Sequence, residues 1–130
     1  MILVDTSVWI DYFNGVDSVQ ANILDRALQH DLIIVGDLIL AELLQGFRSD
    51  KIAEEVRKKL LLCEFRNLVG YDIAIQAAAN YRLLRSRGIT VRKTIDMLIG
   101  TYCIHHGFRL LHNDRDFDPL EQFCGLKVVR

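Results

Sequence analysis

The sequence begins Met1-Ile2-Leu3-Val4-Asp5-Thr6-Ser7, in which a short apolar run is followed at once by a carboxylate. Consecutive apolar side chains predict a strand that is covered on both faces, as in a parallel sheet flanked by helices. Asp5 then falls at the carboxyl end of this strand, the edge of an α/β sheet where ligands bind. Asp, Thr and Ser are also preferred N-caps of helices, so Asp5 alone predicts a site and a helix cap equally well.

The rest of the chain alternates apolar runs with helical periodicity. We expect strands at residues 32–35, 64–69, 108–111 and 126–129, and helices at residues 7–14, 18–30, 38–47, 52–62, 72–88 and 94–106. An acidic loop is expected at residues 112–119. This alternation predicts an α/β fold with a central parallel sheet of about five strands flanked by helices. Because no repeat or linker interrupts the pattern, residues 1–130 are expected to form one domain.

Composition limits the function classes. The chain has 51% hydrophobic residues, and its net charge of -1 excludes a protein that binds nucleic acid through bulk positive charge. A local basic surface remains open. Cys63, Cys103 and Cys124 are odd in number and far apart, which signals neither a disulfide framework nor a zinc site. With no leader-like or membrane-length apolar run, we expect a cytoplasmic protein that has no membrane association.

Two acids occupy positions that need an explanation. Glu42 lies on the expected helix 38–47, which is apolar almost all round, and a buried carboxylate requires a cation, a proton or a cleft unless the helix has an exposed edge. Asp96 lies in the first turn of a helix that we expect Thr94 to cap, where a negative charge suits the helix dipole. Gly100, four residues later, is expected to leave space over Asp96 for a site.

A third group of acids follows the strand expected at residues 108–111. Asp114 falls at its carboxyl end, so Asp114 and Asp5 would face one crevice if the two strands are neighbours. Asp116 and Asp118 either share that site or build the turn before Pro119, and we favour Asp116 for the site. Converging carboxylates raise one another's pKa and require a cation. Ligation by carboxylate oxygens selects Mg²⁺ or Mn²⁺, which in pairs about 3.5–4 Å apart cleave phosphodiesters.

Four stretches, taken in order, resemble the PIN-domain ribonucleases, and in particular the VapC toxins of bacterial and archaeal toxin–antitoxin pairs. They are Val4-Asp5-Thr6-Ser7, Ala41-Glu42-Leu43, Thr94-Ile95-Asp96-Met97-Leu98-Ile99 and Asn113-Asp114-Arg115-Asp116-Phe117. The resemblance covers essentially the whole chain and implies a PIN fold. It implies that the catalytic acids are Asp5, Glu42, Asp96 and Asp114. It further implies metal ligation by Asp5, Asp96, Asp114 and an auxiliary Asp116, with support from Thr6, Ser7 and Asn113.

The resemblance also implies an activity and partners. The expected activity is an endoribonuclease that uses Mg²⁺, with Mn²⁺ as a substitute, and cleaves single-stranded regions of tRNA or rRNA to inhibit translation. The expected partners are a second copy of the chain and a VapB-type antitoxin, which would lie in a groove formed by the helices 38–47 and 52–62 with Trp9 and Phe13. Candidate phosphate contacts, which are equally explained as ordinary surface charges, are Arg48, Arg85, Arg87, Arg92, Lys93 and Arg115.

Two alternatives compete with this hypothesis. A phospho-acceptor receiver domain has a similar length and alternation, but it needs an acidic pair after the first strand and an Asp after the third. Thr6-Ser7 and Val69-Gly70-Tyr71 stand at those places, so the receiver is disfavoured. A non-catalytic PIN module that binds RNA or protein would tolerate loss of the acids, all of which are present.

Overall fold

The computed structural model describes all 130 residues as a five-stranded sheet surrounded by helices. The strands are β1 (Ile2–Val4), β2 (Ile33–Gly36), β3 (Glu64–Arg66), β4 (Arg109–Leu111) and β5 (Lys127–Val128). The helices are α1 (Thr6–Phe13), α2 (Val19–His30), α3 (Asp37–Gln45), α4 (Asp50–Leu60), α5 (Tyr71–Ser86), α6 (Thr94–His106), the 3-10 turn η1 (Arg115–Phe117) and α7 (Asp118–Cys124). The prediction of an α/β fold with about five parallel strands is confirmed.

The sheet has the strand order β3-β2-β1-β4-β5, and all of its pairings are parallel. The chain runs outward from β1 to β3 on one side and then returns to β4 on the other. Leu3 therefore pairs with Ile34 on one side and with Leu110 on the other. β1 is the strand at which the order reverses, and its carboxyl end is the place where an open α/β sheet forms a crevice.

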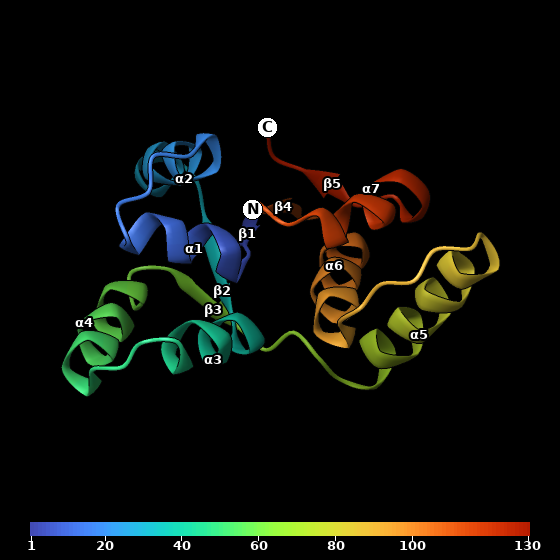
Figure 1. Ribbon diagram of the computed structural model, residues 1–130, viewed down its shortest axis with the longest axis horizontal. Coiled ribbons are helices and arrows are strands. Elements are labelled where there is room, and N and C mark those ends of the chain that lie inside the picture. Colours follow the sequence, from blue (N-terminus) through green and yellow to red (C-terminus); the bar gives the residue numbers. More distant parts are fainter.

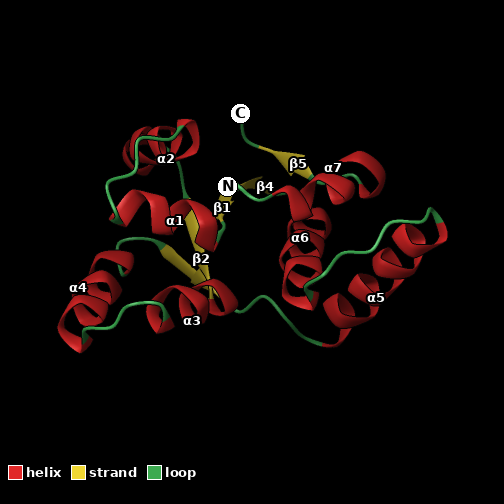
Figure 2. Cartoon of the chain, viewed as in Figure 1, coloured by secondary structure: helices red, strands yellow, loops and turns green.

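The helices form two groups, one on each side of the central strand β1 in the view of Figure 1 (Figure 1, Figure 2). In the first group α1 packs on α2 and α3, and α3 packs on α4. In the second, α5 packs on α6 and α7. Every residue of β1 is buried, because both faces of this strand are covered by helices, as its apolar sequence predicts.

The region after β4 differs from the prediction. The sequence predicts a loop at residues 112–119, but η1 and the start of α7 occupy most of it. Asp114 caps η1 by accepting a hydrogen bond from the Asp116 backbone N–H at 2.9 Å. Pro119 stands at the beginning of α7, where its missing N–H has no partner to lose. The proline therefore starts a helix here, and the acids before it are held in a defined turn.

Gly100 on α6 also has a different role from the one expected. A Cβ atom at this position would lie 2.8 Å from Cδ1 of Leu120 on α7. The space over the glycine is filled by a core side chain and is not part of a site. Gly100 allows α7 to pack closely on α6, an arrangement that a larger residue would obstruct.

Candidate active site

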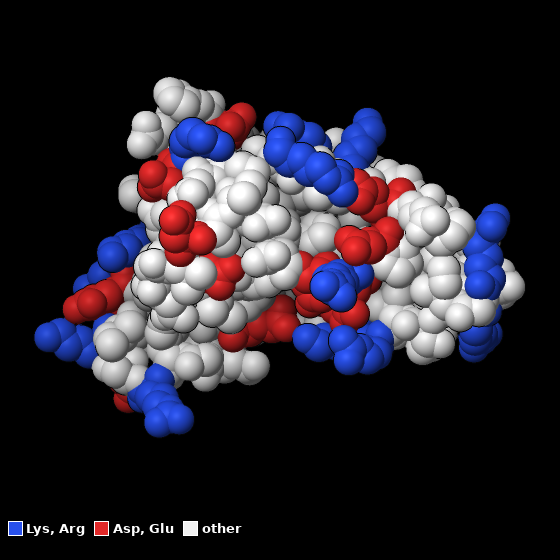
Figure 3. Space-filling view, turned by 45° about the horizontal axis from the view of Figure 1, so that its top comes forward, with Lys and Arg blue, Asp and Glu red and all other residues white.

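Four acidic side chains from four different segments line one cleft of about 280 Å³ at the carboxyl end of the central strands. Asp5 follows β1, Glu42 lies on α3, Asp96 lies on α6 and Asp114 follows β4. Thr6, Ser7, Ile10, Gln45 and Lys93 complete the lining. Acidic atoms gather toward the middle of the molecule in Figure 3, with Lys and Arg atoms beside them. Asp5 and Asp114 face one cleft, as expected, because the strands that they follow, β1 and β4, are paired.

Asp5 combines the two roles that its sequence position left open. It is the N-cap of α1, since its Oδ2 accepts hydrogen bonds from the Ser7 N–H at 3.1 Å and from the Ser7 Oγ–H at 2.6 Å. It also lines the cleft and is only 4% exposed. Burial raises the pKa of Asp5, the bonds from Ser7 oppose that rise, and the nearby charge of Asp114 adds to it. Ser7 therefore donates hydrogen bonds that favour the ionised carboxylate, against the effect of burial.

Asp96 is the most perturbed acid of the cleft. It is 4% exposed, and its Oδ2 is buried with no hydrogen-bond partner. Burial, followed by the charges of Asp5 and Asp114, raises the pKa of Asp96 to about 7, while Lys93 opposes the shift. An unpartnered carboxylate oxygen that faces other acids is the arrangement expected where a cation neutralises the group.

The start of α6 corrects one local prediction. Lys93, and not Thr94, is the N-cap residue, and it makes no side-chain capping bond. The Lys93 side chain lines the acidic cleft instead. Asp96 remains in the first turn, where the helix dipole favours its ionised form and partly offsets the cost of burial.

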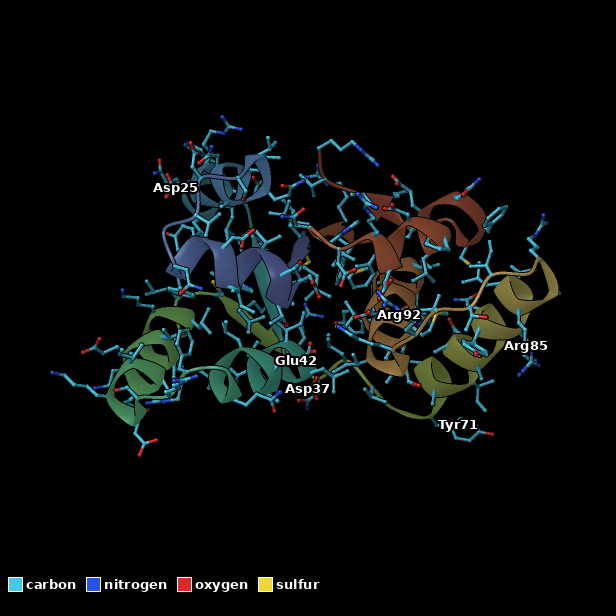
Figure 4. The ribbon with its side chains drawn as sticks, in the orientation of Figure 1. Asp25, Asp37, Glu42, Tyr71, Arg85 and Arg92 are labelled. Atoms are coloured by element: carbon cyan, nitrogen blue, oxygen red, sulfur yellow. The ribbon has the colours of Figure 1, made fainter.

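Glu42 is held by a hydroxyl far away in the sequence. It is half-buried, and its Oε1 accepts a hydrogen bond of 3.0 Å from the Thr6 Oγ1–H. The carboxylate of Glu42 is therefore not buried in the core with the apolar face of α3, because it lies at the edge of α3 that borders the cleft (Figure 4). Thr6 joins the first turn of α1 to α3 and fixes one oxygen of the carboxylate.

Ser7 joins the two strand ends that carry Asp5 and Asp114. Its hydroxyl donates to Asp5, and the same oxygen accepts the backbone N–H of Asn113 at 3.1 Å. The Asn113 side chain in turn donates to Asp11 Oδ2 at 3.2 Å. The three supporting residues expected from the resemblance therefore each bind an element of the cleft wall.

One subset of the acids has the geometry of a cation site. A carboxylate oxygen from each of Asp96, Asp114 and Asp116 lies within 4.8 Å of the others. Oxygen donors of this kind suit hard divalent cations, so these side chains can hold one. Asp118 is outside this group, since it is exposed and lines, with Arg115, a neighbouring hollow that shares only Asp114 with the acidic cleft. The structure brings Asp116, and not Asp118, to the other acids.

The basic residues considered for phosphate contacts lie at different distances from the cleft. Lys93 lines it, and the Arg92 guanidinium lies 3.5 Å from Asp116 Oδ1. Arg115 borders the neighbouring hollow. Arg85 lies at the outer end of α5, well away from Glu42 and Arg92 (Figure 4), and it covers the Tyr81 ring. Arg87 covers the Phe123 ring, and Arg48 lies just before α4.

Three residues at the site, Ile10, Gln45 and His112, are not predicted by the sequence. Gln45 lines the cleft three positions after Glu42, and this helical spacing was the available signal, because residues three apart share a face. The His112 Nδ1 accepts the backbone N–H of Asp114 at 3.2 Å. Burial lowers the pKa of His112, although the surrounding acids act in the opposite direction. A histidine immediately after a strand gave no pattern that distinguished it from a surface residue.

A second hollow, of about 330 Å³, lies between α1, α2 and α4 and is predominantly apolar. Trp9 and Phe13 stack in its wall with ring centroids 5.7 Å apart. The rest of its apolar lining consists of Tyr12, Leu28, Leu32, Ile33, Leu60, Leu62 and Cys63, and the charged residues Asp31 and Lys59 also line it. α2 lines this hollow together with α1 and α4, and a further apolar hollow, lined by Leu40 of α3 and Leu60 of α4, lies between the two helices that the sequence suggested. No helix of the structure has the length and apolar character needed to cross a membrane.

The sequence model of the PIN domain matches residues 2–121 of the chain. The chain belongs to the PIN-domain family, among the VapC ribonucleases. It is 34% identical to VapC ribonuclease Mb1587 of Mycobacterium bovis and to ribonuclease VapC11 of Mycobacterium tuberculosis. Each comparison covers 99% of this chain and 98% of the relative. The family expected from the four sequence stretches is confirmed.

Solved structures show the same fold at low sequence identity. VapBC2 from Rickettsia felis, solved bound to a DNA fragment from its promoter, gives a TM-score of 0.79 at 17% identity, covering 99% of this chain and 98% of the other. FitAcB from Neisseria gonorrhoeae gives a TM-score of 0.77 at 17% identity, covering 100% of this chain and 97% of the other. VapC20 from Mycobacterium tuberculosis, described as a toxin that cleaves the sarcin-ricin loop, gives 0.65 at 16% identity over 91% and 93%.

Proposed function

We propose that the protein is the toxin of a VapBC-type pair, a divalent-metal-dependent endoribonuclease that cleaves single-stranded regions of tRNA or rRNA and so inhibits translation. The observation that carries the proposal is the convergence of Asp5, Glu42, Asp96 and Asp114 in one cleft, where the pKa of Asp96 is raised to about 7. Four carboxylates brought together in this way destabilise the empty site and favour a bound cation. Because tRNA and rRNA function in the cytoplasm, we propose that the protein acts there.

The acids fit a hard divalent cation, for which we propose Mg²⁺, with Mn²⁺ as a substitute. Asp96, Asp114 and Asp116 have the spacing of a cation site, and Asp5, which is outside that group, lines the same cleft as Asp96 and Asp114. When bound, such a cation lowers the pKa of its water and stabilises charge on phosphate oxygens. The unpartnered Oδ2 of Asp96 supports this assignment, because a ligand oxygen lacks a protein partner until the cation binds.

The remaining groups of the cleft have roles that follow from their contacts. Thr6 fixes one oxygen of Glu42, which leaves the other oxygen free to accept a proton from the attacking water. As the water attacks phosphorus in line, the bond from phosphorus to the 3′ oxygen breaks. One fragment then carries a 5′-phosphate, and the other carries a 3′-hydroxyl once its leaving oxygen takes a proton from solvent. Lys93 brings positive charge into the cleft and is the best-placed phosphate contact, with Arg92 and Arg115 at its margin. Arg85 and Arg87 would contact only the outer parts of a long substrate.

We further propose a VapB-type antitoxin and a second copy of the chain as partners. VapBC complexes are among the solved structures that share this fold. A protein segment could bury apolar surface in the hollow beside Trp9 and Phe13. RNA cleavage itself does not need such an exposed apolar hollow, which is typical of a protein-binding site. An antitoxin anchored in this hollow can also cover the acidic cleft, since α1 contributes residues to both.

The test is cleavage of total RNA by the purified protein with Mg²⁺ or Mn²⁺, and with EDTA. The Asp96→Asn variant removes a cleft carboxylate, and Asp25→Asn serves as a matched control because Asp25 is exposed on α2 (Figure 4). We expect discrete metal-dependent fragments from the wild type and the control but none from Asp96→Asn. End-mapping of these fragments would identify the target.

Two other outcomes have definite meanings. Fragments that persist in Asp96→Asn would come from a contaminating nuclease. Intact RNA in every reaction, with an antitoxin shown to be absent and tRNA and rRNA both supplied, would contradict the nuclease proposal and favour a PIN module that binds RNA or protein without cleaving it.

A further inference from the structure

His112 follows β4 directly and stands two residues before Asp114, one of the acids of the cleft. Its Nδ1 accepts the backbone N–H of Asp114 at 3.2 Å, and its ring packs on Phe117 with centroids 4.9 Å apart. An N–H that donates to Nδ1 requires a lone pair there, so the ring is neutral and carries its proton on Nε2. The Nε2 atom is buried and has no partner.

Packing alone does not account for a histidine at this position. A phenylalanine would fill the space beside Phe117 without leaving a buried polar atom unpaired, which costs about 1–3 kcal/mol. The hydrogen bond that His112 makes is the one that it accepts from Asp114. The contact with Asp114 is therefore the feature of His112 that an apolar residue cannot replace.

Side-chain acceptors hold three backbone N–H groups of this turn. Ser7 Oγ holds the N–H of Asn113, His112 holds that of Asp114, and Asp114 Oδ1 holds that of Asp116. The Asp114 carbonyl accepts the N–H of Phe117 at 3.2 Å, whereas the bond from His112 is the one that holds the Asp114 backbone N–H. Without it, this half-buried N–H has to find another partner, and the turn that carries the Asp114 carboxylate must shift.

We infer that His112 is a positioning residue, which fixes the backbone of Asp114 so that its carboxylate faces Asp96 and Asp116 in the arrangement that binds a divalent cation. This inference rests on the proposed function for the identity of the site. Groups that orient metal ligands from behind typically change metal affinity by about 10–100-fold when they are removed.

The test is Mn²⁺ binding to the full-length protein without RNA, measured by the electron paramagnetic resonance of free Mn²⁺. His112→Phe keeps a ring beside Phe117 and removes the acceptor. His112→Asn loses the ring but keeps an oxygen that can accept the N–H two residues on, as in an Asx-turn. His30→Phe is the matched control, because His30 is exposed at the end of α2.

We expect His112→Phe to weaken Mn²⁺ binding about tenfold. His112→Asn should recover most of this loss, and His30→Phe should bind as the wild type does. RNA cleavage by His112→Phe should need correspondingly more Mn²⁺ and approach the wild-type kcat at saturation.

Unchanged affinity in His112→Phe would overturn the positioning role. Equal losses in the Phe and Asn variants, in parallel with their loss of thermal stability, would show that only packing matters and would overturn it as well. A wild-type protein that binds no Mn²⁺ would contradict the proposed metal-dependent function itself. This failure can be told apart from a failure of the positioning role, because it is seen in the wild type before any variant is compared.

Discussion

Replacing Asp96 by Asn should stabilise the metal-free protein at pH 8 while abolishing cleavage. The pKa of the Asp96 carboxyl is raised from 3.8 to about 7 in the folded protein, mainly by burial and then by Asp5 and Asp114. Each pKa unit corresponds to about 1.4 kcal/mol, so ionised Asp96 lowers the free energy of unfolding by at most about 4 kcal/mol. Sharing of protons among the cleft acids makes this an upper bound.

The pH dependence has a definite sign. Because the folded-state pKa of Asp96 is the higher one, the folded protein binds more protons than the unfolded chain between pH 3.8 and about 7. Stability from this group therefore falls as the pH rises through that window and is level above it. The amide introduced by Asp96→Asn cannot ionise, so the advantage of this variant should grow from low pH to pH 8.

The net gain is smaller than the electrostatic one. An amide at the same place brings N–H donors that the carboxylate lacks, and a buried donor left without an acceptor costs about 1–3 kcal/mol. The expected gain at pH 8 is therefore about 2 kcal/mol, or roughly 8 °C in Tm for a domain of this size. At pH 4.5 the variant should be no more stable than the wild type.

The assay is thermal unfolding in EDTA at pH 4.5 and pH 8, repeated at pH 8 with Mn²⁺, and Asp25→Asn is the control. Mn²⁺ at a hundred times its Kd stabilises the protein that binds it by about 2.7 kcal/mol. The wild type should thus gain on adding Mn²⁺ and close the gap to Asp96→Asn. The reasoning is refuted if the variant is no more stable than the wild type at pH 8 in EDTA, or if its gain is equal at both pH values.

Three further substitutions test other features of the cleft and the core. Asp5→Asn keeps an oxygen acceptor for the Ser7 N–H and should raise the metal-free Tm while abolishing cleavage. Asp5→Ala should lose the cap at a cost of about 1 kcal/mol. A fall of several degrees in the Tm of Asp5→Asn would assign a mainly structural role to the charge. Glu42→Gln should lower kcat for RNA cleavage by about 10²-fold or more with little change in Tm, and an unchanged kcat would exclude Glu42 from proton transfer. Gly100→Ala should lower the free energy of unfolding in urea by about 1–3 kcal/mol, because its Cβ would lie 2.8 Å from Leu120 Cδ1. An unchanged free energy of unfolding would show that the packing of α7 on α6 does not need a glycine here.

Strong local patterns in the sequence predicted much of the fold. The apolar run of β1 predicted its burial on both faces, and the periodicity after Thr94 predicted α6 and its end at His106, with a start one residue later than the structure has. The prediction failed for α7, which is only seven residues long and offers about two turns of periodicity next to a proline. Short elements are decided by packing, here by the contact of Leu120 with α6 at Gly100.

The sequence by itself determined which acids stand in unusual local positions, namely after a buried strand, on an apolar helix and in a helix first turn. Only the tertiary structure decided that they converge, because convergence depends on the strand order that places β1 between β2 and β4. The bond from Thr6 to Glu42 spans 36 residues, and the bond from Asn113 to Ser7 spans 106. A local pattern reports the propensity of neighbouring residues, whereas such contacts exist only after the sheet is assembled and the core is packed.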